Sequence, residues 1–300
     1  MKADDARLSF RHGVLFSLGA YTIWGVLPLY LRLVRSVAPL EFVMYRMLFS
    51  AGFVLALLAV RRQWGWLGPA LRSPAILLAS LARASVLSAN WFLFVWAVDR
   101  NRIADASLGY FINPLVSIAL GALALKERLS RARAVAVALA GVGVLWLAIQ
   151  VHQLPWIGII LATTFGTYGL LRKIASLGAL EGLALETLLL SPLAILVLLH
   201  LSQGGGNHLF AAGIRERLLL LAAGPVTAVP LLLFAAGARR LPLSLVGILQ
   251  YVGPTLQLLV GVVVGHEPFG TSKLVGYAFI WLGFIVTSVD AARSERYREA

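Results

Sequence analysis

Three charged side chains lie well inside apolar runs that are long enough to cross a bilayer, where they could bind a charged solute, exchange protons or form ion pairs. They are Arg46, Arg83 and Glu186. A charge at the bilayer centre costs about 2.5–3.5 kcal/mol on insertion scales, so each needs water, a partner or a ligand. Glu186 is the best candidate for a proton-coupling carboxylate, and a structural carboxylate hydrogen-bonded to neighbouring helices is the alternative. Arg83 could instead extend toward the membrane surface.

Polar and aromatic side chains repeat along one face of two predicted helices. Residues at i, i+3, i+4, i+7 and i+10 share one side of a helix. Such sets are Ser107, Tyr110, Phe111, Pro114 and Ser117, and Gly247, Gln250, Tyr251, Pro254 and Gln257. Small polar residues can simply hold helices together, but amides and aromatic rings around a proline favour a cavity wall. Each proline leaves a backbone carbonyl without its donor one turn earlier, so Pro114 and Pro254 are predicted as hinges or as fixed kinks.

Further aromatic and amide residues lie deep in other predicted helices. Tyr21 and Trp24 share one helix face, Tyr168 lies on a second helix, and Asn90 lies on a third, seven residues after Arg83. Aromatic residues near the ends of spans usually anchor a helix at the membrane interface. These residues are deeper, so stacking against a ligand is the alternative.

Residue patterns that would support enzyme chemistry are missing from the sequence. The five histidines lie at or near the ends of apolar runs or in loops, and none pairs at the i, i+4 spacing of a zinc helix. The sequence has no Walker-type phosphate loop, no dinucleotide glycine fingerprint and no Gly-x-Ser-x-Gly elbow. We therefore expect no catalytic residues, no bound metal, no cofactor and no direct drive by ATP.

The elements that must position these side chains are membrane helices. Hydrophobic residues make up 60% of the 300 residues and charged residues 13%, a composition for which the bilayer has to be the solvent. A helix spans a bilayer with about 20 mostly apolar residues, whereas barrel strands alternate in polarity. Ten runs qualify as helical spans: 12–31, 39–60, 74–98, 104–124, 132–150, 154–171, 180–201, 217–238, 243–264 and 273–290.

The chain contains an internal repeat. Residues 90–127 can be laid over residues 230–267 with a constant shift of 140 positions and no gap, which places Pro114 on Pro254. Identities are few, so the strength of the repeat lies in its unbroken register. An internal repeat in so apolar a chain points to a membrane transporter built from two homologous halves.

The two halves are predicted to be residues 1–150 and residues 151–300, with five helices each. An odd number of helices forces the second half to enter the membrane inverted relative to the first. The same shift places Arg46 on Glu186. These two residues could form an ion pair between the halves, but inversion puts each nearer the opposite membrane face, which argues against direct contact.

Two acids lie at the ends of equivalent helices, at Glu127 and Glu267. A carboxylate in this place can cap the next helix or meet loop arginines such as Arg131. We expect this structural role rather than a catalytic or gating one.

Lysine and arginine residues predict the orientation of the chain. When the loops are counted alternately, 17 of the 26 basic residues lie on the side that holds both termini, 7 lie on the other side, and Arg46 and Arg83 lie within spans. Positive residues favour the cytoplasmic side, so both termini are predicted to be cytoplasmic. Basic loops also account for the net charge of +13, without the basic face of a nucleic-acid-binding domain.

Several segments form recognisable motifs: Ala106 to Leu115, Tyr21-x-x-Trp24-Gly25, Asn90-Trp91-x-x-Phe94-x-Trp96-Ala97, Gln250-Tyr251-x-Gly253-Pro254-Thr255 and Ala278 to Trp281. They resemble the signatures of RarD-type proteins of the EamA family, in the drug/metabolite transporter superfamily. Arg46 and Glu186-Thr187 also match, whereas Arg83 matches no motif of the family. The resemblance implies ten helices in two inverted five-helix repeats around a central cavity. The family name refers to chloramphenicol sensitivity or resistance and does not identify a natural substrate.

Together these features predict a multi-pass permease of the bacterial cytoplasmic (inner) membrane that moves a small organic solute by alternating access. The solute is expected to be an amino-acid-like metabolite or an amphiphilic drug, which includes chloramphenicol-related compounds, and export is the expected direction. The alternatives are a membrane-embedded enzyme that acts on a lipid-linked substrate and a non-transporting membrane factor. The sequence does not indicate an oligomeric state. The predicted cavity wall consists of Tyr21, Trp24, Asn90, Tyr110, Asn113, Tyr168, Gln250 and Tyr251.

Overall fold

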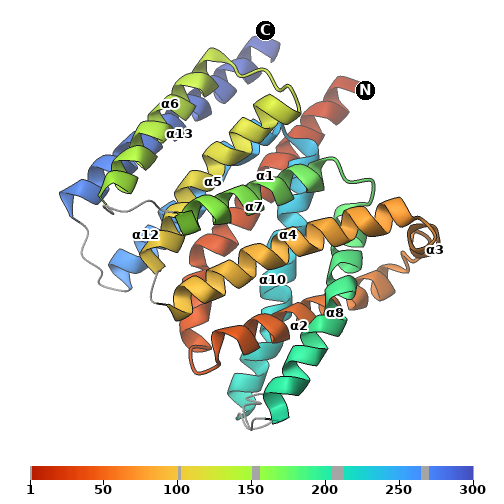
Figure 1. Ribbon diagram of the computed structural model, residues 1–300. Helices are drawn as coiled ribbons and strands as arrows, with labels where there is room; N and C mark the ends of the chain where they lie inside the picture. The colour runs from red at the N-terminus through yellow and green to blue at the C-terminus, as the bar shows by residue number, and fades with distance from the viewer. Residues whose placement is uncertain (1, 101–102, 151–155, 204–212, 265–269, 300) are drawn as a thin grey trace.

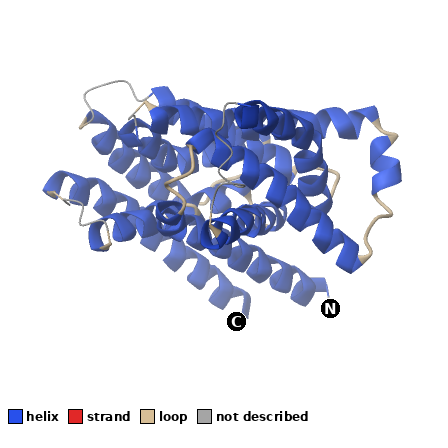
Figure 2. Cartoon of the chain, turned by 90° about the horizontal axis from the view of Figure 1, so that it is seen from below, coloured by secondary structure: helices blue, strands red, loops and turns tan. Residues whose placement is uncertain are grey.

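The computed structural model describes residues 2–100, 103–150, 156–203, 213–264 and 270–299, and all regular elements in these ranges are α-helices (Figures 1 and 2). The helices are α1 (Lys2–Leu33), α2 (Pro39–Arg61), α3 (Leu67–Leu71), α4 (Pro74–Asp99), α5 (Ile103–Ala124), α6 (Arg131–Ile149), α7 (Trp156–Lys173), α8 (Ala179–Gln203), α10 (Ile214–Arg240), α11 (Leu243–Leu249), α12 (Val252–Val263) and α13 (Thr271–Glu299). The predicted all-helical class is confirmed for the described residues.

Length and composition mark much of this bundle as membrane-spanning. Seven helical segments within the described residues are long and apolar enough to cross a bilayer, and Gly109–Ala124 and Leu274–Val286 are shorter apolar segments. The chain is therefore a multi-pass membrane protein. Each of the ten predicted runs coincides with a helix, or with the pair α11 and α12, but the count of ten spans stays a prediction.

Local sequence signals explain where several helices begin and end. Pro39 occupies the first turn of α2, where its missing N–H is no loss. The hydroxyl of Ser130 accepts a hydrogen bond of 3.2 Å from the backbone N–H of Arg133 and so caps α6. At the other end of α2, Arg62 adopts the left-handed conformation, with φ of 51°, that often terminates a helix.

Large apolar side chains cover the outside of the bundle. On α6 the exposed positions Val142, Leu145 and Ile149 follow one another at helical spacing, and Leu196 and Leu199 do the same on α8. Contiguous apolar surface of this kind faces the hydrocarbon of a bilayer rather than water.

Helices from the two halves of the sequence pack against one another throughout the bundle. Helix α1 lies along α10, α2 along α8, and α5 crosses both α7 and α11. Helices α6 and α13 run side by side in Figure 1. The pairs α2 with α8 and α6 with α13 are equivalents under the predicted repeat. The N-terminal end of α1 and the C-terminal end of α13 lie on the same side of the molecule (Figures 1 and 2).

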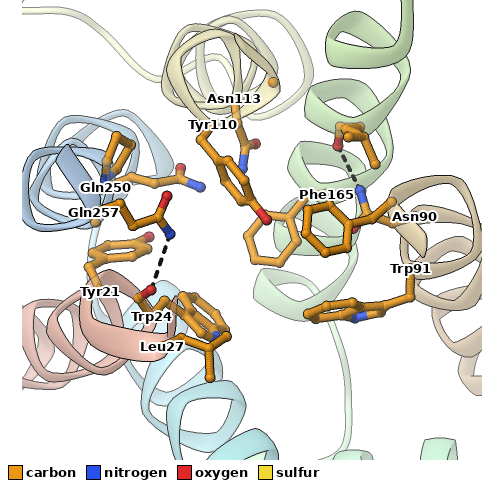
Figure 3. Close-up of a pocket in the computed structure, with 15 residues that line it drawn as sticks. Tyr21, Trp24, Leu27, Asn90, Trp91, Tyr110, Asn113, Phe165, Gln250 and Gln257 are labelled. Carbon is orange, nitrogen blue, oxygen red and sulfur yellow. Dashed lines mark hydrogen bonds between the residues drawn. The ribbon is translucent and has the colours of Figure 1, made fainter. Parts of the chain in front are cut away.

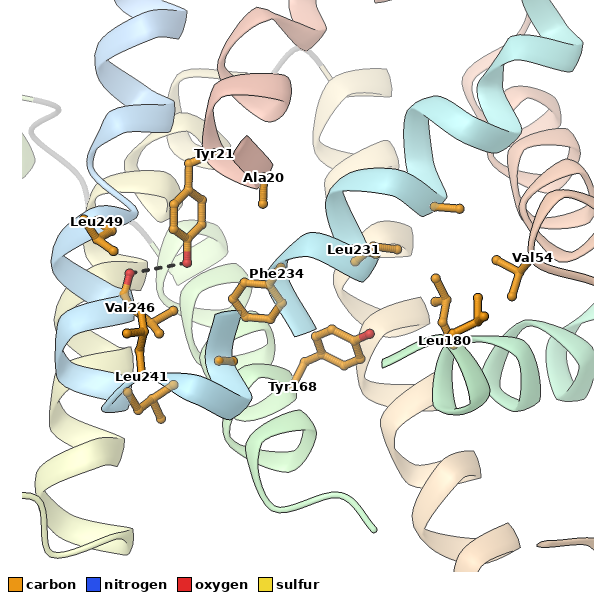
Figure 4. Packing of buried hydrophobic residues seen from close by; sticks show 14 of the residues in the cluster. Ala20, Tyr21, Val54, Tyr168, Leu180, Leu231, Phe234, Leu241, Val246 and Leu249 are labelled. Atoms are coloured by element: carbon orange, nitrogen blue, oxygen red, sulfur yellow. Dashed lines mark hydrogen bonds between the residues drawn. The ribbon is translucent and has the colours of Figure 1, made fainter. Parts of the chain in front are cut away.

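The predicted run 243–264 is interrupted in its middle. Helix α11 ends at Leu249, and α12 begins at Val252, so Gln250 and Tyr251 form the break. Pro254 lies four residues after Gln250 and cannot donate a backbone hydrogen bond to its carbonyl. That carbonyl instead accepts a hydrogen bond of 3.1 Å from Gly253. The break lies beside the largest buried apolar cluster, part of which Figure 4 shows.

Candidate functional site

A cavity of about 90 Å³ lies where α1, α4, α5, α7 and the α11–α12 break come together (Figure 3). Its volume holds several water molecules but is smaller than the ~300–1,000 Å³ of pockets that enclose drug-sized ligands. Of its fifteen lining residues, six are aromatic and four carry a side-chain amide. The lining residues are Tyr21, Trp24, Leu27, Asn90, Trp91, Phe94, Gly109, Tyr110, Asn113, Leu161, Phe165, Gln250, Gly253, Pro254 and Gln257.

Six of the eight residues predicted for the cavity wall line this cavity: Tyr21, Trp24, Asn90, Tyr110, Asn113 and Gln250. The other two lie elsewhere. The hydroxyl of Tyr168 donates to Glu186 at 3.2 Å, and Phe165, one turn earlier on α7, lines the wall instead. Tyr251 is turned toward α5 and α13, where its hydroxyl donates to the carbonyl of Phe111 at 3.4 Å.

The prediction omitted nine of the lining residues, and the sequence held a signal for some of them. Gln257 belongs to the same predicted polar face as Gln250, and Phe165 precedes Tyr168 by one helical turn. Trp91 and Phe94 follow Asn90 in a quoted motif. Gly109 and Gly253 lie in quoted motifs but lack a side chain, and no sequence pattern marked the apolar residues Leu27 and Leu161.

Aromatic rings contact one another along the cavity wall. Trp24 meets Phe165 edge-on with ring centroids 5.6 Å apart, and Phe94 meets Tyr110 at 6.3 Å. Phe234 lies between Tyr21 and Tyr168, with both centroid distances at 6.3 Å (Figure 4). Such pairs are favourable beyond their buried area. One connected aromatic layer includes Trp24 and Phe165, which line the cavity, and continues through Phe234 to Tyr168 behind the wall.

Two of the cavity amides hold helices together. The side-chain amide of Asn90 donates to the carbonyl of Leu161 and to the hydroxyl of Thr164, both at 2.8 Å, and so ties α4 to α7. Gln257 donates to the carbonyl of Trp24 at 3.1 Å and ties α12 to α1 (Figure 3). These contacts fix the spacing of helices across the cavity.

Other polar groups at the cavity have no partner among the described residues. They are Oδ1 of Asn113, Oε1 of Gln250 and Nε1 of Trp91, all buried. The side chains of Asn113 and Gln250 extend toward each other in Figure 3. Because buried polar atoms are nearly always hydrogen-bonded, these groups are suited to contact water or a polar solute.

The two predicted hinge prolines occupy different local structures. Helix α5 continues through Pro114 without a break, whereas the chain is broken four residues before Pro254. The carbonyls that lack a proline donor belong to Tyr110 and Gln250, and both residues line the cavity. Whether either proline acts as a hinge stays a prediction.

Glu186 is the centre of a buried charged cluster. Its Oε1 lies 2.6 Å from Nε of Arg83 and 3.2 Å from an amino nitrogen of Arg172, and its Oε2 accepts the hydroxyl of Tyr168. The side chains of Arg83, Arg172 and Glu186 are exposed by only 5%, 1% and 2%. The partners of Glu186 are therefore these two arginines and not Arg46. Arg172 follows directly after the predicted run 154–171 and is one of the 17 basic residues assigned to the side of the termini, but its side chain belongs to the buried interior.

Arg46 lies apart from this cluster, against a cavity residue. The carbon of its guanidinium group is 3.3 Å from the centroid of the Trp91 ring, a cation–π contact. The residue is 6% exposed, and its Nε has no hydrogen-bond partner among the described residues.

Glu127 has the structural role that its position predicts, but it caps α11 and not α6, the next helix in the chain. Its carboxylate accepts the backbone N–H groups of Leu243 and Ser244 at 2.6 and 3.0 Å, at the start of α11. Lys173 lies 3.9 Å away; burial lowers the pKa of Lys173, and the charge of Glu127 acts against that shift. The equivalent acid Glu267 lies outside the described residues.

The part of the chain that the structure describes contains no group of three or more metal-ligating side chains. The lining groups that could contact a solute are aromatic rings and amides, and the charge of Arg46 lies behind Trp91.

Comparison with known proteins gives the family. Residues 11–149 match the model of the EamA-like transporter family. The chain is 44% identical to "Protein RarD" of Streptomyces exfoliatus, over 100% of this chain and 94% of that protein. It is 35% identical to "Chloramphenicol-sensitive protein RarD" of Pseudomonas aeruginosa, with 94% and 95% covered. A solved structure, titled "Crystal structure of protein", shares the fold with a TM-score of 0.70 at 20% identity, with 95% and 99% covered. The chain belongs to the EamA-like transporter family and is a RarD-type protein of that family.

Proposed function

We propose that this protein is a permease of the bacterial cytoplasmic membrane that carries a small organic solute through the cavity by alternating access. The observation that supports this best is the cavity itself, which lies between helices of both halves and combines aromatic walls with unpartnered amides. Aromatic rings would stack on the apolar part of a solute, while Asn113 and Gln250 would orient its polar groups.

The small volume of the cavity implies that the helices around it separate during transport. A solute of drug size needs several times the present ~90 Å³. The break at Gln250 and Tyr251, together with Pro114 on the crossing helix α5, would provide the points of bending. In this proposal residues 1–150 and 151–300 are inverted repeats, and both termini are cytoplasmic.

The solute that we propose is an amino-acid-like metabolite or an amphiphilic drug, and export is the proposed direction. The name of the Pseudomonas aeruginosa relative includes chloramphenicol sensitivity, so chloramphenicol-related compounds belong in the first set of solutes to test. Proton coupling through Glu186 is not part of the proposal, because its oxygens are engaged by two arginines and a tyrosine.

A two-step experiment tests the proposal. Cells that overproduce the chain are compared with cells that overproduce Asn113→Leu, and the metabolites in cells and medium are profiled. Solutes that differ are then measured for flux in liposomes that contain the purified protein. Val142→Leu on the lipid-facing surface of α6 serves as the matched control.

Three outcomes separate the proposed function from its rivals. Flux that is lost in Asn113→Leu and kept in Val142→Leu supports transport through the cavity. Chemical conversion of a lipid-linked compound without flux would indicate an enzyme instead. Neither flux nor conversion would leave the protein as a non-transporting membrane factor and would overturn the proposal.

A further inference from the structure

Arg46 carries a buried charge that no acidic side chain of the described residues balances. It lies seven residues after Pro39, the first residue of α2, and is 6% exposed. The other two buried arginines, Arg83 and Arg172, share the carboxylate of Glu186. Arg46 has no such contact, and its Nε lacks any hydrogen-bond partner among the described residues. A buried guanidinium in this state is costly unless an anion or water completes its shell.

The contacts of Arg46 lead directly to the cavity. Its guanidinium covers the ring of Trp91, with 3.3 Å from its carbon to the ring centroid, and Tyr110 and Tyr30 are close enough to interact with its charge. Both Trp91 and Tyr110 line the cavity. Arg46 is not itself a lining residue, so Trp91 connects the unbalanced positive charge to one side of the cavity. The indole of Trp91 also provides an N–H donor there that has no hydrogen-bond partner among the described residues.

The rest of the lining does not oppose an anion. The described lining residues include aromatic, aliphatic and amide side chains and no acid. In a site of low effective dielectric constant, one uncompensated charge a few ångströms away strongly favours a solute of opposite sign. A carboxylate has one negative charge and two acceptor oxygens, which match one guanidinium and one neighbouring N–H.

Resting on the proposed transport function, we infer that Arg46, together with Trp91, makes the cavity selective for organic solutes that carry a carboxylate group. In this assignment the carboxylate of the solute lies at the Trp91 side of the cavity and completes the shell of Arg46. The aromatic layer around Trp24 and Phe165 contacts the apolar part of the same solute.

The test compares acids with their neutral amides in liposomes that contain the full chain. The probes are N-acetylphenylalanine, N-acetyltryptophan and N-acetylleucine, each paired with the corresponding N-acetyl amino-acid amide. Each pair keeps shape and apolar surface almost constant and changes only the charge. The unmodified chain is compared with Arg46→Gln, Arg46→Lys and the control Arg61→Gln, which removes an exposed arginine from the end of α2.

The inference predicts faster uptake of the acid than of the amide in every pair that the unmodified chain transports. In Arg46→Gln, acid uptake should fall by roughly 30-fold or more, the effect expected when one partner of a buried charge pair is removed. Uptake of the amide should change little, Arg46→Lys should recover part of the acid preference, and Arg61→Gln should behave as the unmodified chain.

Several results would overturn the inference. Equal uptake of acid and amide by the unmodified chain would overturn it, even if Arg46→Gln does not fold. An acid preference that survives in folded Arg46→Gln would also overturn it. If the solute found in cells is transported and carries no carboxylate, carboxylate selectivity is wrong and the proposed function stands. If no solute moves at all, the proposed function itself fails and the inference fails with it.

A final arm distinguishes a solute carboxylate from an anionic lipid headgroup. Acid uptake is measured in phosphatidylcholine liposomes with and without phosphatidylglycerol. Solute recognition predicts the same acid-to-amide ratio in both membranes. An acid-to-amide ratio of the unmodified chain that falls to that of Arg46→Gln when phosphatidylglycerol is added would show that a headgroup occupies the Arg46 site, and would overturn the assignment to a solute.

Discussion

Neutralising Glu186 should destabilise the bundle more than any other conservative change in its interior. Glu186→Gln keeps the shape of the side chain and one carbonyl acceptor but removes the charge. In the native chain this carboxylate contacts Arg83 at 2.6 Å and Arg172 at 3.2 Å, and all three side chains are buried, with exposed fractions of 5% or less. After the change, two buried guanidinium groups face each other without a carboxylate.

The expected cost follows from these contacts. Removing one partner of a buried ion pair costs about 3–5 kcal/mol, and here one carboxylate serves two arginines. Arg83→Gln should cost less, about 1–3 kcal/mol, because Arg172 and Tyr168 still contact Glu186. The double variant of Glu186→Gln with Arg83→Gln removes one charge of each sign. It should therefore be less destabilised than the sum of the two single variants, by about 0.5–3 kcal/mol.

The assay is the free energy of unfolding in detergent micelles, followed by far-ultraviolet circular dichroism as sodium dodecyl sulfate is added. Glu181→Gln, in the first turn of the same helix α8, is the control and should cost no more than about 1 kcal/mol. A loss in Glu186→Gln equal to that of Glu181→Gln, or strictly additive effects in the double variant, would refute the account of the charged cluster.

The remaining predictions concern helix crossings, capping and proton coupling. Gly247→Ala should destabilise the fold and reduce transport, because the added Cβ would lie 2.7 Å from the carbonyl oxygen of Pro114; Gly141→Ala, with open space around its Cβ, should be neutral in the same unfolding and flux assays. Glu127→Ala should lower the free energy of unfolding by about 0.5–2 kcal/mol through loss of the α11 cap, and no loss would argue against that cap. Folded Glu186→Gln should keep the shape of the pH profile of transport; a flattened profile would restore proton coupling through this carboxylate.

Hydropathy predicted the helices well because membrane spans are set by one requirement, a run of apolar residues of sufficient length. The break in the run 243–264 was only partly predictable. Pro114 and Pro254 give the same sequence signal, yet α5 continues through one and the chain is broken before the other. The difference comes from the tertiary surroundings, since neighbouring groups decide whether freed backbone atoms are satisfied within a bent helix or at a break.

Six residues of the cavity wall could be predicted because polar and aromatic groups at membrane depth must avoid lipid. The partners of Glu186 could not. Arg83 matched no motif, and Arg172 was counted as a loop residue because it lies at the end of its apolar run. Its side chain nevertheless folds inward to Glu186 at 3.2 Å. The rotation of each helix about its axis determines such contacts, and one sequence does not specify that rotation.

The most direct test of the central proposal, that the cavity opens alternately to the two sides of the membrane, uses the absence of cysteine from the sequence. Asn113→Cys places one thiol in the cavity wall, and Val142→Cys places one on the lipid-facing surface of α6. Labelling by a membrane-impermeant maleimide is measured in right-side-out and in inside-out vesicles. The account predicts that Asn113→Cys is labelled from both sides, more slowly when transported solute is present, while Val142→Cys is labelled from neither. Labelling of Asn113→Cys from one side alone, or from neither, would contradict alternating access through this cavity.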